Sequence, residues 1–344
     1  MTGRSMGAAR HRPRLPNAER GADAFASVAD QLRRIERDGD GGDGTLTLPG
    51  DVSLAVTSLD KPYFPEDGVT KGGVMRYYAR LAPAILPAIA DRVLVLRRYP
   101  TGIHGPYFHQ HDPGEHVPEG VRVERVAEAG GDVERRIVGD DPAARPGAAL
   151  ATLLYTVQLG AIVVNAWHSR GSVPETPDYA VLDLDPQPDA PFPRIVDVAR
   201  RVHEALVRRG LSSVPKTSGS RGIHMLVPLP PGSSFEEAAA LSAEVATEVA
   251  ESNPTIATVE RSIDARPPGS VYVDHLQNAL GKTLATVFSV RARRGALVST
   301  PLDWARITRT LAPERYTVAT VGRRSEEHMA RWERLWREAS AGGR

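Results

Sequence analysis

Cysteine is absent from the 344-residue sequence, which excludes disulfides, thiolate catalysis and cysteine-ligated zinc. No run of about 18 uninterrupted apolar residues is present, so the sequence predicts no transmembrane helix. Residues 1–16 are rich in basic side chains and lack the apolar core of a signal peptide. These absences predict a soluble, cytoplasmic protein with no membrane partner.

Lysine is scarce as well. It occurs only at Lys61, Lys71, Lys216 and Lys282, and the other 39 of the 43 basic residues are arginine. A chain that uses arginine for its general surface charge keeps lysine where a compact ammonium is needed, so these four lysines are candidate functional positions. Chance retention is the alternative. The net charge of +1 excludes no partner, since basic residues can gather on a face that binds nucleic acid.

Predicted strands and helices alternate along the chain, which is typical of an α/β fold with mixed sheets. Residues 1–44 are interpreted as a flexible tail and linker, because Gly and Asp dominate residues 38–44. Residues 45–311 are expected to form the main domain, and residues 312–344 a C-terminal helical extension. Helices are predicted over 22–37, 70–89 (interrupted by Pro83 and Pro87), 147–159, 194–209, 234–252 and 325–338. Strands are predicted over 45–48, 53–56, 93–96, 161–164, 179–185, 213–216, 222–229, 271–276 and 286–290, with a long loop over 101–118.

Two carboxylates at the end of the strand over 179–185 give the strongest chemical signal. Side chains alternate across a strand, so Asp183 and Asp185 are expected on one face. Carboxylates this close repel each other unless a cation lies between them, and hard oxygen ligands favour Mg²⁺ or Mn²⁺. Asp274, on another predicted strand, makes the set suitable for a two-metal site. The alternative is an exposed strand end with solvated aspartates.

The segment Lys216–His224 predicts a loop that binds phosphate. Gly219 and Gly222 let the backbone turn, so that amide groups and the Ser218 hydroxyl can face an anion. Lys216, Arg221 and His224 can add positive charge. An ordinary hairpin turn is the alternative, because Ser and Gly are common there.

Basic residues with nearby aromatics form a third group. Arg97 and Arg98 end a predicted strand, and Tyr107 and Phe108 follow in the loop, where exposed rings could stack on bases. Anchoring of the loop in the core is the alternative interpretation. Four histidines in this loop match no zinc-site spacing.

Several motifs in order resemble the polymerase domain of bacterial non-homologous end-joining ligase D, within the archaeo-eukaryotic primase superfamily. The resemblance runs from about Val52 to Leu311 and implies a primase-polymerase fold with an RRM-like catalytic core and an N-terminal α/β lobe. The motifs are Leu59-Asp-Lys61, Arg98-Tyr-Pro100, Leu182-Asp-Leu-Asp-Pro186, Thr217-Ser-Gly-Ser-Arg-Gly-Ile-His224, Val271-Tyr-Val-Asp-His-Leu-Gln-Asn278, Gly281-Lys-Thr283 and Ser299-Thr-Pro-Leu-Asp-Trp304.

The resemblance also implies roles for individual residues. Asp183, Asp185 and Asp274 would be catalytic and bind two metal ions, Mn²⁺ or Mg²⁺. An NTP or dNTP substrate and the DNA would be bound by two further sets of side chains. The nucleotide set is Ser218, Arg221, His224, Lys282, Arg291, Asn165 and Arg98, and the DNA set is Lys61 and Lys71 at a 5′-phosphate with Tyr107 and Phe108 at the template.

Two features depart from the family pattern. Asn165 stands where the family has a histidine associated with the nucleotide sugar; His168 lies close enough in sequence to be a substitute. The Lys-x-Asp-Gly motif of a nucleotidyl-lysine ligase is absent, so the protein is expected to act at DNA ends either alone or beside Ku and a separate ATP-dependent ligase.

The sequence therefore predicts a nucleotidyltransferase that fills gaps or extends DNA ends in double-strand-break repair, with a preference for ribonucleotides implied by resemblance. It would act in the cytoplasm, associated with the nucleoid. A non-catalytic end-bridging module is one alternative, although three clustered carboxylates give no benefit to a protein that only binds polyanions. A metal-dependent phosphoesterase is another, but it has no need for the pair Lys61 and Lys71.

Overall fold

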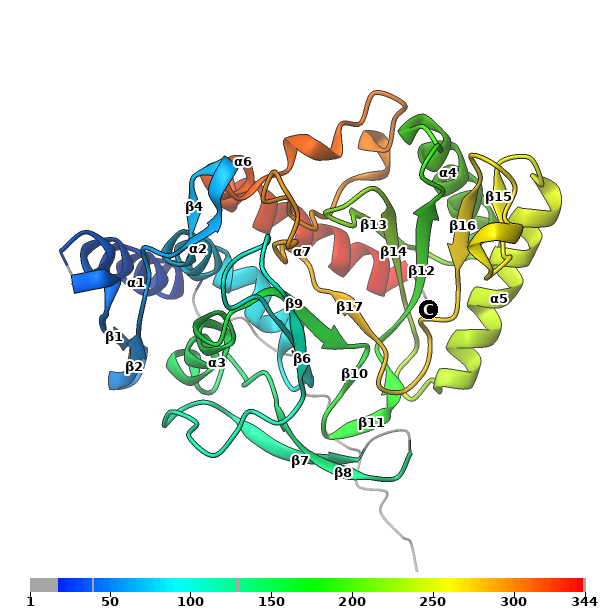
Figure 1. Ribbon diagram of the computed structural model, residues 1–344. Coiled ribbons are helices and arrows are strands. Elements are labelled where there is room, and N and C mark those ends of the chain that lie inside the picture. Colours follow the sequence, from blue (N-terminus) through cyan, green and yellow to red (C-terminus); the bar gives the residue numbers. More distant parts are fainter. Residues whose placement is uncertain (1–17, 39, 128–129, 343–344) are drawn as a thin grey trace, which may run out of the picture.

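The structure, a computed structural model, describes residues 18–38, 40–127 and 130–342. Two sheets lie side by side and are flanked by helices (Figure 1), so the mixed α/β class predicted from the sequence is confirmed. Within these ranges, no helix is long and apolar enough to cross a bilayer. The helices are α1 (Ala18–Asp38), α2 (Lys71–Ile89), α3 (Pro146–Gln158), α4 (Phe192–Arg208), α5 (Phe235–Ser252), α6 (Val318–Arg323) and α7 (Ser325–Gly342).

The larger sheet has five strands in the order β13-β14-β12-β16-β15, and only the β15–β16 pair is parallel. Helices α4 and α5 cover one face, where Leu182 and Leu184 pack against Ile195, Val202 and Val245. Alternation along β12 therefore directs its aspartates to the opposite face, away from α4 and α5. The strands are β12 (Tyr179–Pro186), β13 (Val214–Thr217), β14 (Ile223–Pro228), β15 (Ala257–Thr258) and β16 (Val271–Asp274).

The second sheet is antiparallel, in the order β17-β9-β5-β6, and shares a core with α2 and α3. Its strands are β5 (Leu94–Arg98), β6 (Phe108–Gln110), β9 (Ala161–Trp167) and β17 (Thr283–Ala285). Helix α2 is mostly buried, and the Tyr78 hydroxyl donates to the carbonyl of Ile162 at 2.7 Å. Pro83 and Pro87 were predicted to interrupt this helix, but it continues through both of them. Contacts with α1, α3 and α7 keep the backbone helical.

Four smaller features differ from the predicted elements. The strand predicted over 286–290 is replaced by β17, because the ladder hydrogen bonds to β9 are made three residues earlier, at 283–285. The loop over 101–118 contains β6, which pairs with β5. Two hairpins were not predicted, because charged residues interrupt their apolar pattern. They are β7 (Val123–Ala127) with β8 (Val133–Ile137), and β10 (Ser169–Arg170) with β11 (Val173–Pro177).

The N-terminal helix belongs to the folded unit. Phe25, Val28 and Leu32 of α1 are buried, and Glu36 accepts a hydrogen bond from Thr70, the N-cap residue of α2. The segment after α1 was predicted to be a flexible linker, but its end is fastened, since Asp43 accepts from the amide of Ser58 at 2.6 Å. Residues 1–17 of the predicted tail lie outside the described residues. Strands β1 (Gly44–Leu48) and β2 (Val52–Val56) form a hairpin, and β3 (Pro62–Phe64) pairs with β4 (Val69–Thr70).

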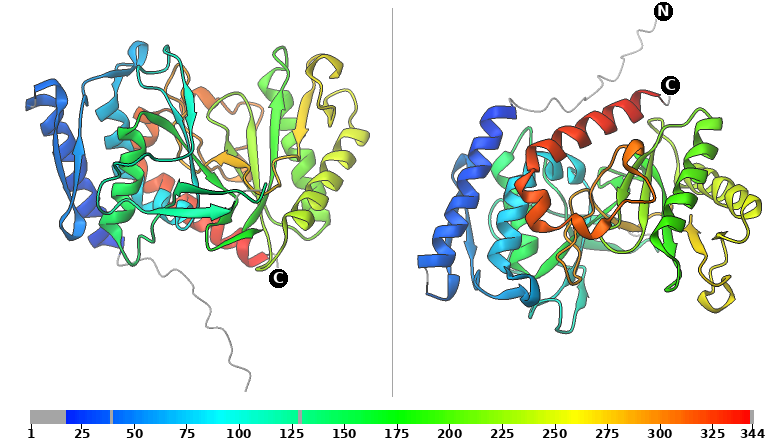
Figure 2. Two further views of the ribbon diagram at one scale, coloured as in Figure 1. Left: turned by 60° about the horizontal axis from the view of Figure 1, so that its bottom comes forward. Right: turned by 90° about the horizontal axis from the view of Figure 1, so that it is seen from above.

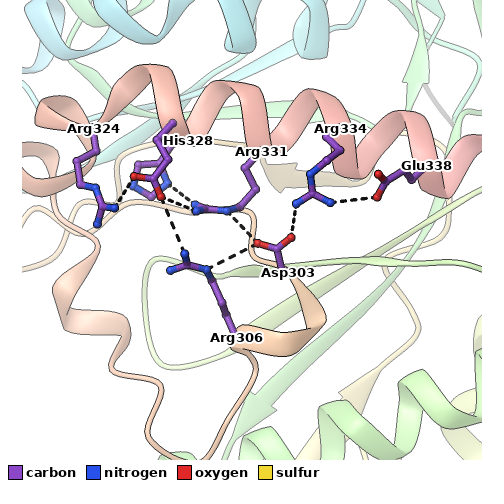
Figure 3. A network of polar contacts seen from close by, with 8 residues as sticks. Asp303, Arg306, Arg324, His328, Arg331, Arg334 and Glu338 are labelled. Atoms are coloured by element: carbon purple, nitrogen blue, oxygen red, sulfur yellow. Dashed lines mark hydrogen bonds and ion pairs between the residues drawn. The ribbon is translucent and has the colours of Figure 1, made fainter.

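The C-terminal helix α7 runs along one side of the molecule (Figure 2, right) and packs against α2, β13 and β14. Its polar face is tied to the segment after residue 301 through the carboxylate of Asp303 (Figure 3). That carboxylate accepts from Arg331 Nε at 3.0 Å and from Arg334, and Glu327 accepts from Arg331 at 2.6 Å. The guanidinium of Arg331 is largely buried, so the ion pairs are shielded from solvent.

We expect Asp303→Asn to lower the free energy of unfolding by about 2 kcal/mol, because Arg331 keeps its burial and loses a charged partner. Urea denaturation measures the change. Asp197→Asn is the matched control: its ion pair with Arg309 is exposed, and such pairs contribute about 0–1 kcal/mol. Equal losses in the two variants would mean that Asp303 does not fasten α7.

Candidate active site

One row of side chains crosses four neighbouring strands of the larger sheet. Lys216 of β13 is paired in register with His224 of β14, His224 with Asp183 of β12, and Asp183 with Asp274 of β16. Side chains at paired positions point to the same face, so all four lie on the face that α4 and α5 leave free. Asp185 lies on this face two residues further along β12. The register thus places together the three aspartates predicted to form the catalytic centre.

The three carboxylates differ in the hydrogen bonds that they accept. Asp274 accepts hydrogen bonds from Gln277 Nε2 at 2.7 Å and from the amide of Leu276 at 2.8 Å. Asp183 Oδ1 is buried with no hydrogen-bond partner among the described residues, although His224 Nε2 lies 3.5 Å away. Burial, followed by repulsion from the other two aspartates, raises the pKa of Asp183 well above its usual range. Burial and Asp274 raise the pKa of Asp185 as well.

The chemistry of these three carboxylates is suited to binding a divalent cation. The donors are hard oxygens, one of them has no other partner, and their mutual repulsion is relieved by positive charge. Among the described residues, no three His, Asp or Glu side chains are already placed to hold one ion. Magnesium-type ions are often bound by one or two carboxylates together with substrate phosphates, so a complete protein cage is not required.

The predicted phosphate loop lies next to the aspartates. Gly219 has φ +69°, and a Cβ there would meet Arg291 Cγ at 2.4 Å; at Gly222 it would meet the carbonyl of Leu184 at 2.3 Å. Both glycines are therefore needed for close packing. Ser218 Oγ accepts from the amides of Ser220 and Gly222, which closes the turn.

Positive charge reaches the loop from two directions. Arg291 donates to the carbonyl of Ser218 at 3.1 Å, and its charge favours the ionised forms of Asp183 and Asp185. Arg221 is exposed and donates to the carbonyl of Pro188 at 3.2 Å. Arg291 and Arg221 thus bring positive charge near Asp183 and Asp185.

Lys216 does not lie at the anion-binding surface of the phosphate loop, where it was predicted. It was expected to add positive charge at the loop, yet only 1% of it is exposed, and its ammonium lies behind His224. Ala285 of β17 and Ser299 cover this end of the face, since the Lys216 ammonium lies 2.9 Å from the carbonyl oxygen of Ala285 and 2.6 Å from Ser299 Oγ. It therefore contacts the imidazole and no bound anion.

Sequence reasoning missed Arg266, and it grouped Arg97 with the aromatic residues without placing it at the nucleotide site. The guanidinium of Arg266 lies 4.0 Å from the ring centroid of Tyr272, the residue paired with Asp185, and its charge favours the ionised form of Asp185. Arg97 lies near Arg291 and 3.5 Å from the ring centroid of Tyr107. Arg266 is in an irregular segment with no motif. Arg97 is next to Arg98, which the resemblance selected instead.

The lysine pair forms a second site, at the start of α2. The Lys71 amide donates to the carbonyl of Lys61 at 2.8 Å, and the Lys71 ammonium donates to the carbonyl of Thr57 at 2.7 Å. Lys61 Nζ donates to the carbonyl of Pro100 at 3.1 Å. Burial, together with the charges of Lys61 and Arg98, lowers the pKa of Lys71 to about 8. Such a concentration of positive charge favours a bound anion.

Arg98 belongs with this second site. It donates to Gln110 Oε1 at 2.7 Å and lies 5.1 Å from the ring centroid of Phe108. Its predicted contact with the nucleotide stays a prediction. Tyr107 and Phe108 are 50% and 46% exposed, so both rings are free to stack on a base.

His168 does not occupy a position from which it could replace the family histidine at position 165. Asn165 is partly exposed on β9, paired with Ala285 of β17, and keeps its donor and acceptor groups. His168 is fully buried, and within the part of the chain that the structure describes neither ring nitrogen has a hydrogen-bond partner. Burial lowers its pKa to about 3. It is thus unsuited to replace a histidine at position 165. Lys282 is exposed, and its predicted contact with the nucleotide stays a prediction.

A family model described as LigD, primase-polymerase domain, matches residues 70–332 of this chain. The chain belongs to this family. The multifunctional non-homologous end joining protein LigD of Mycobacterium bovis is 30% identical over 262 residues, which are 74% of this chain and 33% of that protein. The bifunctional non-homologous end joining protein LigD of Bacillus subtilis is 28% identical over 274 residues, which are 79% of this chain and 42% of that protein.

The chain thus spans about a third to two fifths of the length of these LigD proteins. The solved polymerase domain from Mycobacterium tuberculosis ligase D, in complex with DNA, superposes with a TM-score of 0.73 and 28% identity. The match covers 83% of this chain and 99% of that one, so the LigD polymerase fold extends over most of the molecule.

Proposed function

We propose that this protein is a template-directed nucleotidyltransferase that fills gaps or extends DNA ends during double-strand-break repair. The observation that carries the proposal is the register of β12 against β16, which brings Asp183 and Asp185 beside Asp274. The phosphate loop and Arg291 border the same carboxylates. Membership of the LigD primase-polymerase family supports this use of the site.

In this proposal, Asp183, Asp185 and Asp274 hold two divalent cations, Mn²⁺ or Mg²⁺. When bound, these ions would activate the primer 3′-hydroxyl and stabilise the leaving pyrophosphate. Ser218, Arg221, His224 and Arg291, together with Lys282, bind the triphosphate of an NTP or dNTP. Arg97 and Arg266 add positive charge at the two borders of the site.

DNA binding is assigned to the second site and to the exposed rings. Lys61 and Lys71 bind the 5′-phosphate at a gap or end, while Tyr107 and Phe108 stack on the template. The solved relative is described as a complex with DNA, which supports this assignment. The relatives' names give an end-joining context, and we propose Ku and an ATP-dependent ligase as partners at nucleoid DNA.

The affinity for a 5′-phosphate is expected to fall as the pH rises above about 8. Free Lys71, with its pKa lowered to about 8, loses its proton there, whereas a bound phosphate favours the ammonium. Binding between about pH 8 and 10 therefore takes up a proton. Calorimetry in buffers of different ionisation enthalpy measures this uptake. Equal uptake with 5′-hydroxyl DNA, or with the Lys71→Met variant, would contradict the assignment.

Primer extension on a 5′-phosphorylated gapped duplex with Mn²⁺ tests the proposed function. Extension with ribonucleoside or deoxyribonucleoside triphosphates is the expected result, with ribonucleotides favoured. The ratio of the two rates, compared between wild type and Asn165→His, measures the contribution of position 165 to sugar choice. Tight binding that depends on the 5′-phosphate, with no extension by either substrate, would favour an end-bridging module instead.

A further inference from the structure

Lys216 is a fully buried lysine whose hydrogen bonds are nearly all accounted for by neighbouring groups. Its Nζ lies 2.9 Å from the carbonyl oxygen of Ala285, 2.6 Å from Ser299 Oγ and 2.6 Å from His224 Nδ1. A carbonyl oxygen can only accept, so one proton of the amine is committed to Ala285. The other two contacts depend on which partner donates.

The hydroxyl of Ser299 settles the second contact. Ser299 Oγ donates its single proton to the carbonyl of Thr217 at 2.8 Å, so it must accept from Lys216. Two protons of the amine are now used. Burial and the charge of Arg291 lower the pKa of Lys216 well below its usual range, whereas the charge of Asp183 favours the ammonium. The ammonium form has a third proton, which is then directed at His224 Nδ1.

The number of protons on Lys216 determines which ring nitrogen of His224 carries the proton. If Nδ1 accepts from Lys216, the ring proton is carried by Nε2, which points toward Asp183 Oδ1 at 3.5 Å. A neutral imidazole then lies between an ammonium and a carboxylate, each facing the matching nitrogen. With the opposite tautomer, a lone pair on Nε2 would face the carboxylate oxygen.

We propose that Lys216 is a positioning residue that fixes the orientation and tautomer of His224, so that its Nε2–H, which faces Asp183, is available to the phosphates of a nucleotide bound beside that carboxylate. Lys216 itself touches no substrate, because only 1% of it is exposed and its donors are used within the protein. The inference rests on the proposed function for the role of the phosphates. The arrangement of the imidazole, however, exists in the free protein and can be measured there.

Thr217 offers a matched control. Its hydroxyl donates to the carbonyl of Val298 at 2.9 Å and accepts from the amide of Thr300 at 2.9 Å. It therefore fastens β13 to the same segment that Ser299 occupies, and it makes no hydrogen bond to His224. Thr217→Val removes buried hydrogen bonds of similar number, whereas Lys216→Met removes the ammonium while keeping an unbranched apolar stem.

The test is ¹⁵N NMR of the histidine rings in the nucleotide-free protein, with His224→Gln used to assign the signal. We expect a single Nε2–H tautomer for His224 in the wild type and in Thr217→Val, and loss of this single form in Lys216→Met. In primer extension, Lys216→Met should raise the nucleotide KM about tenfold, the effect of one charge-assisted hydrogen bond, with unchanged affinity for gapped DNA. Thr217→Val should keep the tautomer of His224 and raise KM by less than Lys216→Met does.

Retention of the Nε2–H tautomer in Lys216→Met would overturn the inference, and so would an equal change in Thr217→Val. Loss of the tautomer with an unchanged KM would overturn the link to the nucleotide. If the wild type extends no primer, the proposed function fails, while the ring spectra still decide whether Lys216 sets the tautomer of His224.

Discussion

Replacing Asp185 by asparagine is expected to lower the rate of primer extension at least about a thousandfold, equivalent to about 4 kcal/mol of transition-state stabilisation. The change keeps the size of the side chain and removes one of the charges that we propose to hold the divalent cations. Because the lysine pair is not altered, affinity for a 5′-phosphorylated gap should stay within about twofold. Single-turnover extension and fluorescence anisotropy measure the two quantities.

Asp197→Asn is the control for this variant, since Asp197 lies on α4 and pairs with exposed Arg309. It should extend primers at the wild-type rate. Loss of extension and of gap binding together in Asp185→Asn, with a lowered melting temperature, would mean that Asp185 has a structural role. Unchanged extension would remove Asp185 from the catalytic centre.

The double variant Lys61→Ala/Lys71→Ala should lose about a hundredfold in affinity for a 5′-phosphorylated gap. Each lysine would make a charge-assisted contact with the phosphate, and about 1.5 kcal/mol for each gives this factor. Affinity for the same gap with a 5′-hydroxyl should change little, because the phosphate that these lysines recognise is missing. Competition binding with the two DNA forms measures the difference.

Equal losses on phosphate and hydroxyl DNA would contradict a phosphate pocket and indicate general loss of DNA binding. Unchanged turnover of a 5′-phosphorylated gap by the double variant would favour a phosphoesterase, which has no need for the pair. Lys71 also bonds the carbonyl of Thr57, so the melting temperature of the variant must be compared with that of Lys61→Ala alone.

The sequence allowed the position of the aspartates on β12 to be predicted, because alternation along one strand is a local property. It did not show that Asp274 lies beside them, since register between β12 and β16 depends on the packing of α4 and α5. Lys216 illustrates the same limit. Its residue type fits an anion site, but Ala285 and Ser299, which are distant in sequence, cover it and bury its ammonium.

Two other differences also have tertiary causes. The helix over 22–37 was predicted, yet its packing was not, although Phe25, Val28 and Leu32 recur at helical spacing and are buried on one side. The strand predicted over 286–290 was chosen from its apolar residues. Those residues are buried without forming a ladder, because β9 pairs with residues 283–285.

Incorporation into a one-nucleotide gap with a 5′-phosphate tests the central claim most directly. The four nucleotides are supplied separately, opposite each of the four template bases, with Mn²⁺ present. The account predicts that the primer grows by one residue with the complementary nucleotide, and that Asp185→Asn abolishes this product. Incorporation that ignores the template base, or none by the wild type on a gap that it binds tightly, would contradict it.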